Sequence, residues 1–321
     1  MNRTPSLRTT CAMAVAALAL AACSNNGGSS SDHAGASSSS AATASAKPAA
    51  SGGHVKLAYV EWSSCTAATN VVKAALEQKG YTVDAVSVSG AAMYSAIANG
   101  DADATVCAWL PTTQANYYAK TKDRLDNLGP NMQGTKLGLV VPDYVSIDSI
   151  EQLKANADKF DDRIVGIDPG AGEMDLTQKV IKQYGLPLKL VAGSGATMTA
   201  ALKSAIDEHK WIVVTGWTPH WMWARWKLKY LADPKNIYGD AESIDTLARK
   251  GLQTSDPGAY AILDGFHWTA GDMQQVMAAA REPGSDPASA AKQWVAAHPD
   301  KVDAWTGSAD TKGMADTGTA Q

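Results

Sequence analysis

The feature that most constrains the fold is an alternation of strand-like and helix-like segments that runs through the chain twice. Short alternating or wholly apolar runs indicate strands, and apolar residues at helical spacing indicate helices. Strands are expected at residues 54–62, 81–89, 102–111, 136–142, 163–168, 188–193 and 211–217. Helices are expected between them at residues 69–80, 91–100, 146–160, 172–185 and 195–210. This alternation is typical of α/β proteins with mostly parallel sheets, and its restart after a break at residues 141–144 predicts two lobes.

Capping residues indicate where several of these helices begin and end. Thr69 or Asn70 is the expected N-cap of the first helix, and Gly100 is the expected stop of the second. Ser149 and Gln152 have the spacing of a capping box. After residue 235 the chain is expected to be mostly helical, with helices at residues 243–251, 256–266, 269–281 and 286–299. Asp286 followed by a proline is a clear helix start.

The first residues predict export and lipidation. Arg3 and Arg8 precede an apolar run over residues 12–22 that is too short to span a membrane and fits a secretory signal. The run ends in "LAAC", which resembles the lipobox of bacterial lipoproteins, and this resemblance implies that Cys23 carries the lipid. The alternative is an ordinary signal peptide with a chance cysteine. We therefore expect an exported lipoprotein, anchored to a membrane and located in the periplasm or at the cell surface.

The chain is expected to divide into a signal peptide, a tether, a two-lobed body and a tail. Residues 23–53 are nearly all Ser, Ala and Gly, so burial cannot offset the entropy of ordering them, and they are expected to form a disordered tether. The predicted segments are 1–22 (signal peptide), 23–53 (lipidated tether), 54–142 (first lobe), 143–250 (second lobe), 251–305 (a helical return packing mainly on the first lobe) and 306–321 (a flexible tail).

Charge and motif content argue against several classes of function. Without Arg3 and Arg8 the chain has 26 basic against 32 acidic residues and no basic run, so nucleic acid is not an expected partner. The histidines are scattered, and no nucleophile motif or dinucleotide fingerprint is present, so we expect no metal, no cofactor and no catalytic site. A binding protein is preferred. An α/β enzyme without a recognisable catalytic motif and a structural surface lipoprotein are the alternatives.

Three tryptophans lie at the ends of predicted strands. The chain has ten Trp but only two Phe, and four of the tryptophans fall in "TGWTPHWMWARW" (215–226). Ligands of open α/β sheets bind at the carboxyl ends of strands, where Trp62, Trp109 and Trp217 are expected. An indole face attracts a cation, and several indoles together suit a quaternary ammonium group. The other tryptophans of residues 215–226 are expected to be packing residues.

A glycine-rich turn follows the strand at residues 163–168. In "GIDPGAGEM" (166–174) the turn leads into a helix, so free backbone N–H groups and a positive helix end suit an anion such as a carboxylate. The alternative is a tight turn without a ligand. An aromatic cage together with an anion site describes a small zwitterion such as a betaine.

At these residues the chain resembles the glycine betaine substrate-binding proteins of ABC transporters. The resemblance rests on "YVEW", "TNVV", "DADATVCAWLPTT", "KLGLVVPDYV", "GIDPGAG", "VVTGWTPHWMWARWKLKYLADP" and "FHWT", which extend over about residues 55–305. It implies a two-lobed fold of the type II periplasmic binding proteins with the ligand cleft between the lobes. It also implies delivery of an osmoprotectant to an ABC permease subunit by a monomeric binding protein.

The resemblance assigns roles to individual residues. It implies that Trp62, Trp109 and Trp217 surround the ammonium group. It further implies that the backbone amides of Gly172 and Glu173 hold the carboxylate. Binding would then bridge the lobes and favour their closed arrangement.

Departures from the family pattern leave the exact ligand open. Gln114 stands where some members have a His that helps hold the carboxylate, and Glu173 stands where an apolar residue is usual, so its charge is expected to point away from the ligand. Choline-binding relatives have an Asp after the first cage tryptophan, where this chain has Ser63 and Ser64. Glycine betaine is the expected ligand, with choline, carnitine, proline betaine and trimethylamine oxide as alternatives.

Two cysteines lie close to the predicted cage in sequence. Cys65 follows Trp62 by three residues, and Cys107 precedes Trp109 by two. In an oxidising compartment two such cysteines form a disulfide that braces the cage or remain as two free thiols.

Overall fold

The computed structural model describes residues 52–307, and the proposed signal peptide, Cys23 and the tail lie outside this range. The first expected run of strands and helices is present. Its elements are β1 (His54–Tyr59), α1 (Ser63–Gln78), β2 (Thr82–Ser87), α2 (Gly90–Asn99), β3 (Ala104–Leu110), α3 (Ala115–Thr121) and the 3-10 helix η1 (Lys122–Arg124). Gly100 ends α2 in the left-handed conformation, as predicted. The predicted cap at Thr69 or Asn70 is wrong, because α1 already begins at Ser63 and Thr69 is buried within it.

The second run follows a long strand, β4 (Leu125–Pro142). Its elements are η2 (Ile150–Phe160), β5 (Arg163–Val165), α4 (Gly172–Tyr184), β6 (Lys189–Val191), α5 (Gly195–Asp207), β7 (Val214–Thr218), α6 (Met222–Arg225) and β8 (Leu228–Tyr230). The predicted capping box at Ser149 and Gln152 is present, although it starts a 3-10 helix rather than an α-helix. The capping serine and glutamine thus determine where the helix begins, but not its type.

The return of the chain is partly helical. It consists of β9 (Glu242–Arg249), α7 (Leu252–Ser255), α8 (Pro257–Gly265), α9 (Ala270–Ala279), α10 (Pro287–Ala297) and α11 (Pro299–Trp305). The predicted N-cap Asp286 accepts hydrogen bonds from the backbone N–H groups of Ala288 and Ser289. The helix predicted at residues 243–251 is wrong, because this segment is strand β9. Its Leu, Ala and Arg residues favour helix, but pairing on both sides with β3 and β4 overrides that preference.

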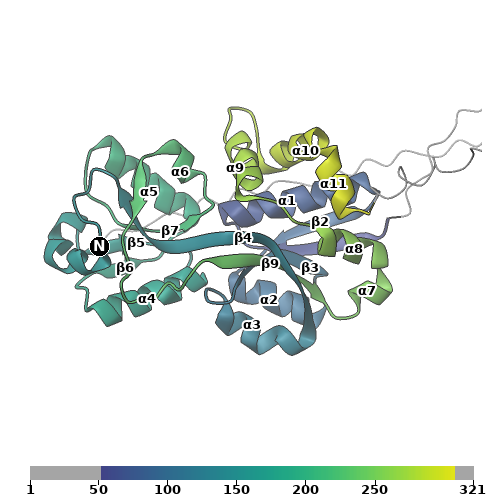
Figure 1. Cartoon of the computed structure of the whole chain (residues 1–321), viewed down its shortest axis with the longest axis horizontal. Coiled ribbons are helices and arrows are strands. Elements are labelled where there is room, and N and C mark those ends of the chain that lie inside the picture. The colour runs from purple at the N-terminus through teal and green to yellow at the C-terminus, as the bar shows by residue number, and fades with distance from the viewer. Residues whose placement is uncertain (1–51, 308–321) are drawn as a thin grey trace, which may run out of the picture. The chain divides into compact units, whose positions relative to one another are not determined.

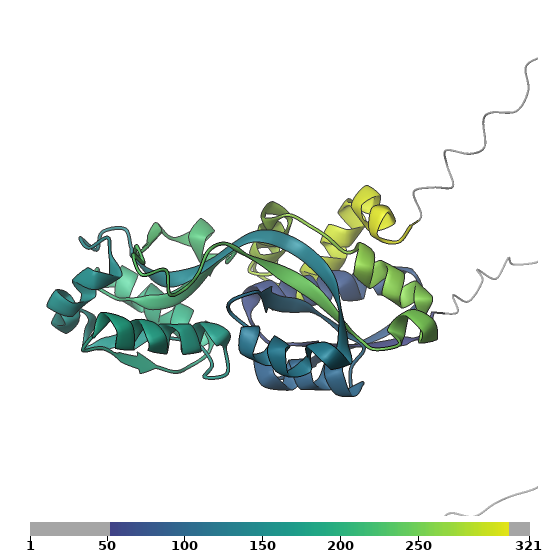
Figure 2. The same ribbon diagram turned by 60° about the horizontal axis from the view of Figure 1, so that its bottom comes forward.

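The strands pair in the order β2-β1-β3-β9-β4-β7-β5-β6, with β8 also paired to β4. β1 is parallel to β2 and β3, and β5 is parallel to β6 and β7. The expectation of mostly parallel sheets is wrong at the centre, where β9 is antiparallel to β3 and β4, and β4 is antiparallel to β7 and β8. The reason is that β4 and β9 run side by side in opposite directions between the two halves (Figures 1 and 2).

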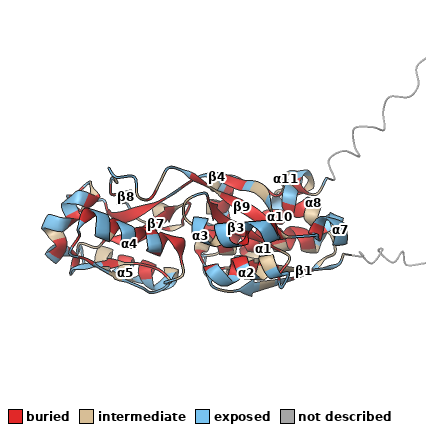
Figure 3. Cartoon of the chain, turned by 90° about the horizontal axis from the view of Figure 1, so that it is seen from below, coloured by how far each residue is buried: buried red, intermediate tan, exposed pale blue. Residues whose placement is uncertain are grey.

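We define the first lobe as β1–β3, β9, residues 125–135 of β4, and helices α1–α3 and α7–α11. The second lobe comprises residues 136–142 of β4, β5–β8 and helices α4–α6. In Figure 1, α1 with α9–α11 covers one face of the first sheet, and α2 and α3 cover the other. The division of the body at residues 142 and 250 stays a prediction. Buried residues run through the sheets of both lobes, and exposed residues cover the outer sides of the helices (Figure 3).

The N-terminal half of β4 was missed because its sequence contains turn residues. Its register against β9 shifts between Asn127 and Gly129, between Pro130 and Met132, and between Gln133 and Thr135. Gly129 and Gly134 have positive φ there (96° and 79°). Glycine and proline therefore mark β-bulges inside a continuous strand.

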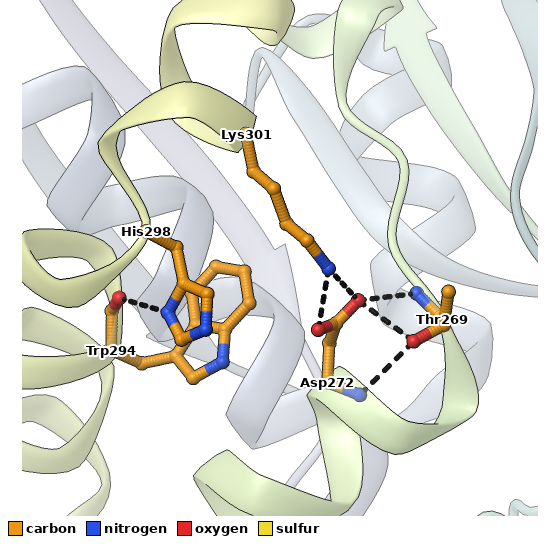
Figure 4. A network of polar contacts seen from close by, with 5 residues as sticks. All are labelled: Thr269, Asp272, Trp294, His298 and Lys301. Carbon is orange, nitrogen blue, oxygen red and sulfur yellow. Dashed lines mark hydrogen bonds and ion pairs between the residues drawn. The ribbon is translucent and has the colours of Figure 1, made fainter.

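A polar network ties the last three helices together and accounts for one of the remaining tryptophans (Figure 4). Lys301 of α11 donates to both carboxylate oxygens of Asp272 in α9, each at 2.6 Å. Asp272 also forms a capping box with Thr269. His298 stacks on Trp294 of α10 with ring centroids 4.2 Å apart. Trp294 is therefore a packing residue that holds α10 and α11 together, far in sequence from the cage candidates.

Candidate functional site

A small, mostly apolar pocket lies where the two lobes meet. The first lobe contributes two of the three cage candidates, and the second lobe contributes the third together with the glycine-rich turn. The residues lining the pocket are Trp62, Ser64, Trp109, Thr113, Gln114, Leu137, Ile167, Ala171, Gly172, Glu173 and Trp217. All six residues predicted to bind ligand are among them.

The three tryptophans come from three different elements. Trp62 is the N-cap of α1, Trp109 lies near the end of β3, and Trp217 lies near the end of β7. Only 7%, 4% and 3% of their respective surfaces are exposed. Two short strands and a helix start thus bring three large indoles to one apolar space between the lobes.

A hydrogen bond orients the Trp62 ring, and an aromatic contact packs against the Trp217 ring. The indole N–H of Trp62 donates to the Asp168 carboxylate of the second lobe at 2.7 Å. The backbone carbonyl of Trp217 accepts the indole N–H of Trp223 at 2.8 Å, and the Trp217 ring packs edge-on against His220 with centroids 4.6 Å apart. The contact with Asp168 holds a ring of one lobe against a loop of the other.

The structure contains a disulfide between Cys65 and Cys107, with their Cα atoms 5.3 Å apart. It joins α1 to β3, the elements that carry Trp62 and Trp109. Both sulfurs are buried within the first lobe. The covalent link therefore fixes the spacing of the two elements from which the first lobe's cage candidates project.

The N-terminus of α4, in the second lobe, also lines the pocket. Ala171, the N-cap, has no side chain that could accept a hydrogen bond from the first turn. The N–H groups of Gly172 and Glu173 belong to that turn, where backbone donors have no partner within the helix. These two amides and the positive helix end provide a place for an anion.

Gly172 is required by the close approach of the two lobes. A Cβ at this position would lie 1.9 Å from the carbonyl oxygen of Thr113, which belongs to the first lobe. Any larger residue would therefore push the N-terminus of α4 away from the loop after β3.

Gln114 presents an amide donor to the pocket. Its Oε1 accepts hydrogen bonds from the Tyr94 hydroxyl at 2.9 Å and from the backbone N–H of Trp109 at 2.8 Å. These two donors determine which end of the side-chain amide is oxygen, so the other end is Nε2. Nε2 is buried and has no hydrogen-bond partner among the residues described. The side chain thus braces Trp109 with its oxygen and leaves its N–H groups without a partner among the described residues.

Glu173 is almost completely buried, at 2% exposure. Burial raises the pKa of its carboxyl to about 8, although the backbone N–H groups of Gly216 and Gly138 act in the opposite direction. At neutral pH the side chain is therefore mostly an uncharged acid. The negative charge that was expected to point away from the ligand is therefore mostly absent at neutral pH.

Two further hydrogen bonds join the lobes. Met222 N–H donates to Nδ1 of His220 at 3.1 Å, so the ring hydrogen is on Nε2, 3.0 Å from the Ser63 hydroxyl of the first lobe. The Tyr117 hydroxyl donates to the carbonyl of Gly170 at 2.9 Å. Burial lowers the pKa of His220 to about 3, helped by the positive charge of Arg281. His220 is consequently a neutral hydrogen-bond donor to the first lobe.

Several pocket residues were missed by sequence reasoning. They are Ser64, Thr113, Leu137, Ile167 and Ala171. All except Leu137 are within five residues of a predicted site residue. Leu137 could have been recognised as the pairing partner of Trp217 only if the register of β4 and β7 had been known. Asp168 was visible in the glycine-rich turn, but its contact with Trp62 spans 106 residues and has no local signal.

The other tryptophans of residues 215–226 do not line this pocket. Trp223 packs on Tyr230 with centroids 4.6 Å apart. Trp221 packs on Trp226 on one side, and the Arg281 guanidinium lies 4.2 Å from its ring.

In residues 52–307 no helix is long and apolar enough to cross a membrane, and no cluster of His, Cys, Asp and Glu has the composition of a metal site.

The chain matches the family model for the substrate-binding domain of ABC-type glycine betaine transport systems over residues 53–297. The chain belongs to this family. A family member from Listeria monocytogenes, the glycine betaine/carnitine transport binding protein GbuC, is 51% identical over 146 residues, which are 44% of this chain and 48% of that protein. The matched segment thus spans about half the length of that relative.

Solved structures of the family share the two-lobed architecture. Lactococcal OpuAC, in its closed-liganded conformation with glycine betaine, is 44% identical, with a TM-score of 0.75 over 79% of this chain and 99% of that one. An ABC-transporter choline binding protein in complex with choline is 26% identical, with a TM-score of 0.74 over 79% of this chain and 92% of that one. The chain is therefore an α/β substrate-binding protein of two lobes.

Proposed function

We propose that the protein captures glycine betaine, or a closely related quaternary ammonium osmolyte, outside the cytoplasm and delivers it unchanged to an ABC permease. The observation that carries the proposal is the meeting of three buried indoles with uncharged hydrogen-bond donors in one pocket between the lobes. A quaternary ammonium group has no N–H to donate, so aromatic faces attract it in water-excluded sites, with about 2 kcal/mol or more for a desolvated contact.

In the proposed complex Trp62, Trp109 and Trp217 surround the ammonium group. The carboxylate accepts hydrogen bonds from the backbone N–H groups of Gly172 and Glu173 and from Nε2 of Gln114. The buried, unpartnered Nε2 supports this arrangement, because a buried donor without a partner costs about 1–3 kcal/mol and a carboxylate would supply the partner. These donors favour a betaine over choline, which lacks a carboxylate.

The proposal includes a binding cycle without chemistry. Ligand contacts to both lobes stabilise the arrangement in which Trp62 meets Asp168, and the permease would recognise that arrangement. The lipid anchor at Cys23 and the monomeric state belong to the proposal as well. Carnitine, proline betaine and trimethylamine oxide are further candidates for the pocket.

Calorimetric titration with glycine betaine, proline betaine, carnitine, choline and trimethylamine oxide tests the proposal. We expect saturable binding that is strongest for the betaines. Replacing Trp217 by Ala should weaken binding by about 2 kcal/mol, or roughly thirtyfold, whereas Trp294→Ala, which alters a tryptophan that does not line the pocket, should leave affinity unchanged. Absence of binding to all five compounds, or turnover of any of them, would refute the proposal.

A further inference from the structure

The Glu173 side chain is an unusual group to find at the anion end of this pocket. It lies in the first turn of α4, lines the pocket and is 2% exposed. One of its carboxyl oxygens, Oε1, is buried without a hydrogen-bond partner among the residues described. The backbone N–H groups of Gly138 and Gly216 donate hydrogen bonds to the carboxyl. These two glycines are paired in the register of β4 and β7.

Among the residues that the structure describes, no cation, whether Lys, Arg or His, forms an ion pair with this carboxyl. The titratable groups facing it are the hydroxyls of Tyr230 in β8 and Tyr238 in the following loop. These hydroxyls share hydrogen bonds with Thr218 and Thr177, each at 2.8 Å.

The ammonium of Lys136 in β4 lies 4.5 Å from the centroid of the Tyr230 ring, and among the described residues it forms no ion pair with Glu173. β4 and β7 present glycine backbone at this point, and Asp175 on the same helix is exposed to solvent. A buried carboxylate without a cation is costly, so the proton stays on the carboxyl. The pKa of Glu173 is accordingly raised by burial to about 8. At neutral pH the group has an O–H to donate beside the amides of the helix start.

We propose that Glu173 is a specificity-determining residue whose uncharged carboxyl donates a hydrogen bond to the carboxylate of a zwitterionic ligand. The inference rests on the proposed function and adds a protonation requirement to it. Once Glu173 loses its proton, two carboxylates would share one buried site, and the zwitterion is released. A cation without a carboxylate meets no such repulsion and gains an attractive charge instead. The preference for a betaine over choline therefore decreases as the pH rises.

The proton on Glu173 determines the direction in which betaine affinity changes with pH. In the free protein Glu173 holds its proton up to about pH 8, and in the complex the hydrogen bond to the ligand holds the proton to a higher pH. Between these two pKa values the binding of a betaine takes up a proton, and its Kd rises by up to about tenfold per pH unit. Glycine betaine has no group that titrates between pH 6.5 and 9.5, so the protein alone is responsible for the change.

Calorimetric titrations with glycine betaine and with choline, from pH 6.5 to 9.5, test the inference on the wild-type protein and on Glu173→Gln. We expect the Kd for glycine betaine to rise about tenfold or more in the wild type over this range and to stay constant in the variant. The Kd for choline should stay constant or fall in the wild type. Titration at pH 8.5 in buffers with different ionisation enthalpies should show proton uptake with glycine betaine.

The outcomes separate this inference from the proposed function. If glycine betaine binds the wild type with the same Kd at pH 6.5 and 9.5 and without proton uptake, the inference is wrong while the proposed function stands. If neither ligand binds at any pH, both are wrong. The proton-uptake measurement uses only the wild-type protein, so it decides the question even if Glu173→Gln does not fold.

Discussion

Replacing Gly172 by Ala should separate ligand binding from folding. The new Cβ would lie 1.9 Å from the Thr113 carbonyl oxygen, whereas real Cβ atoms essentially never approach other atoms closer than 3.0 Å. Thr113 belongs to the first lobe and Gly172 to the second, so the clash arises only when the lobes are together. An opening of at least about 1.1 Å would relieve it, because 3.0 Å is the shortest tolerated contact.

The expected loss of ligand affinity follows from the hydrogen bonds between the lobes that such an opening would stretch. The bond from Trp62 to Asp168 is 2.7 Å long, and the bond from Tyr117 to Gly170 is 2.9 Å long. A rigid separation would lengthen them to about 3.8 Å and 4.0 Å, beyond hydrogen-bonding distance. A bond to a carboxylate contributes about 2 kcal/mol and a neutral one about 1 kcal/mol. Their sum of about 3 kcal/mol corresponds to a weakening of ligand affinity by about a hundredfold.

The assay is a titration with glycine betaine followed by intrinsic tryptophan fluorescence, together with denaturant unfolding. Gly170→Ala is a matched control in the same turn, because its Cβ would have no neighbour closer than 3.8 Å. We expect both variants to unfold at the wild-type midpoint or slightly above it, since Ala restricts the unfolded chain more than Gly. If Gly172→Ala binds within about threefold of Gly170→Ala, the ligand-bound state lacks the contact between Thr113 and Gly172, and the pocket as described is not the binding site.

Two further predictions concern stability. Replacing both Cys65 and Cys107 by Ala opens a loop spanning 42 residues and should lower the free energy of unfolding by about 4 kcal/mol, which guanidinium titration measures; a loss below about 1 kcal/mol would show that the link does not restrict the unfolded chain. The folded-state pKa of His220, lowered by burial to about 3, means that its stabilising contribution is complete above about pH 6.5 and is lost as the pH falls towards 3. Unfolding at pH 7, 5 and 4 should show a slope of up to about 1.4 kcal/mol per pH unit from this residue. His220→Gln should lack that slope and the exposed His267→Gln should keep it; equal slopes in all three proteins would contradict the assignment.

The sequence was sufficient for the two runs of alternating strands and helices, because each helix and outer strand carries its own local pattern. It was not sufficient for β9 and the first half of β4. Residues 243–251 have helical composition, and residues 125–135 contain Gly129, Pro130 and Gly134, which locally indicate turns. Both segments are strands only because each is the neighbour of the other. The antiparallel centre of the sheet is therefore a tertiary effect that single-sequence patterns do not contain.

The candidate site was predicted to the extent that its residues have individual signals. The tryptophans at strand ends and the glycine-rich turn are visible in the sequence, and the structure brings them to one pocket. The contacts that join the lobes lack such signals. Ser63 and His220 are 157 residues apart, and Trp62 and Asp168 are 106 apart. Nothing in the local sequence links the two members of either pair, so only the folded arrangement identifies the pairs.

Glu173 illustrates why the identity of a residue does not determine its charge. In sequence it is an acid at an anion site, and its negative charge argues against a ligand with a carboxylate. Burial between α4 and the glycine backbone of β4 and β7 reverses that argument, because the carboxyl keeps its proton at neutral pH. Gly138 and Gly216 expose the backbone that the carboxyl contacts, so two glycines far from the turn help determine its protonation. The ligand preference of this pocket therefore depends on the packing beneath the turn as much as on the tryptophans that surround the ammonium group.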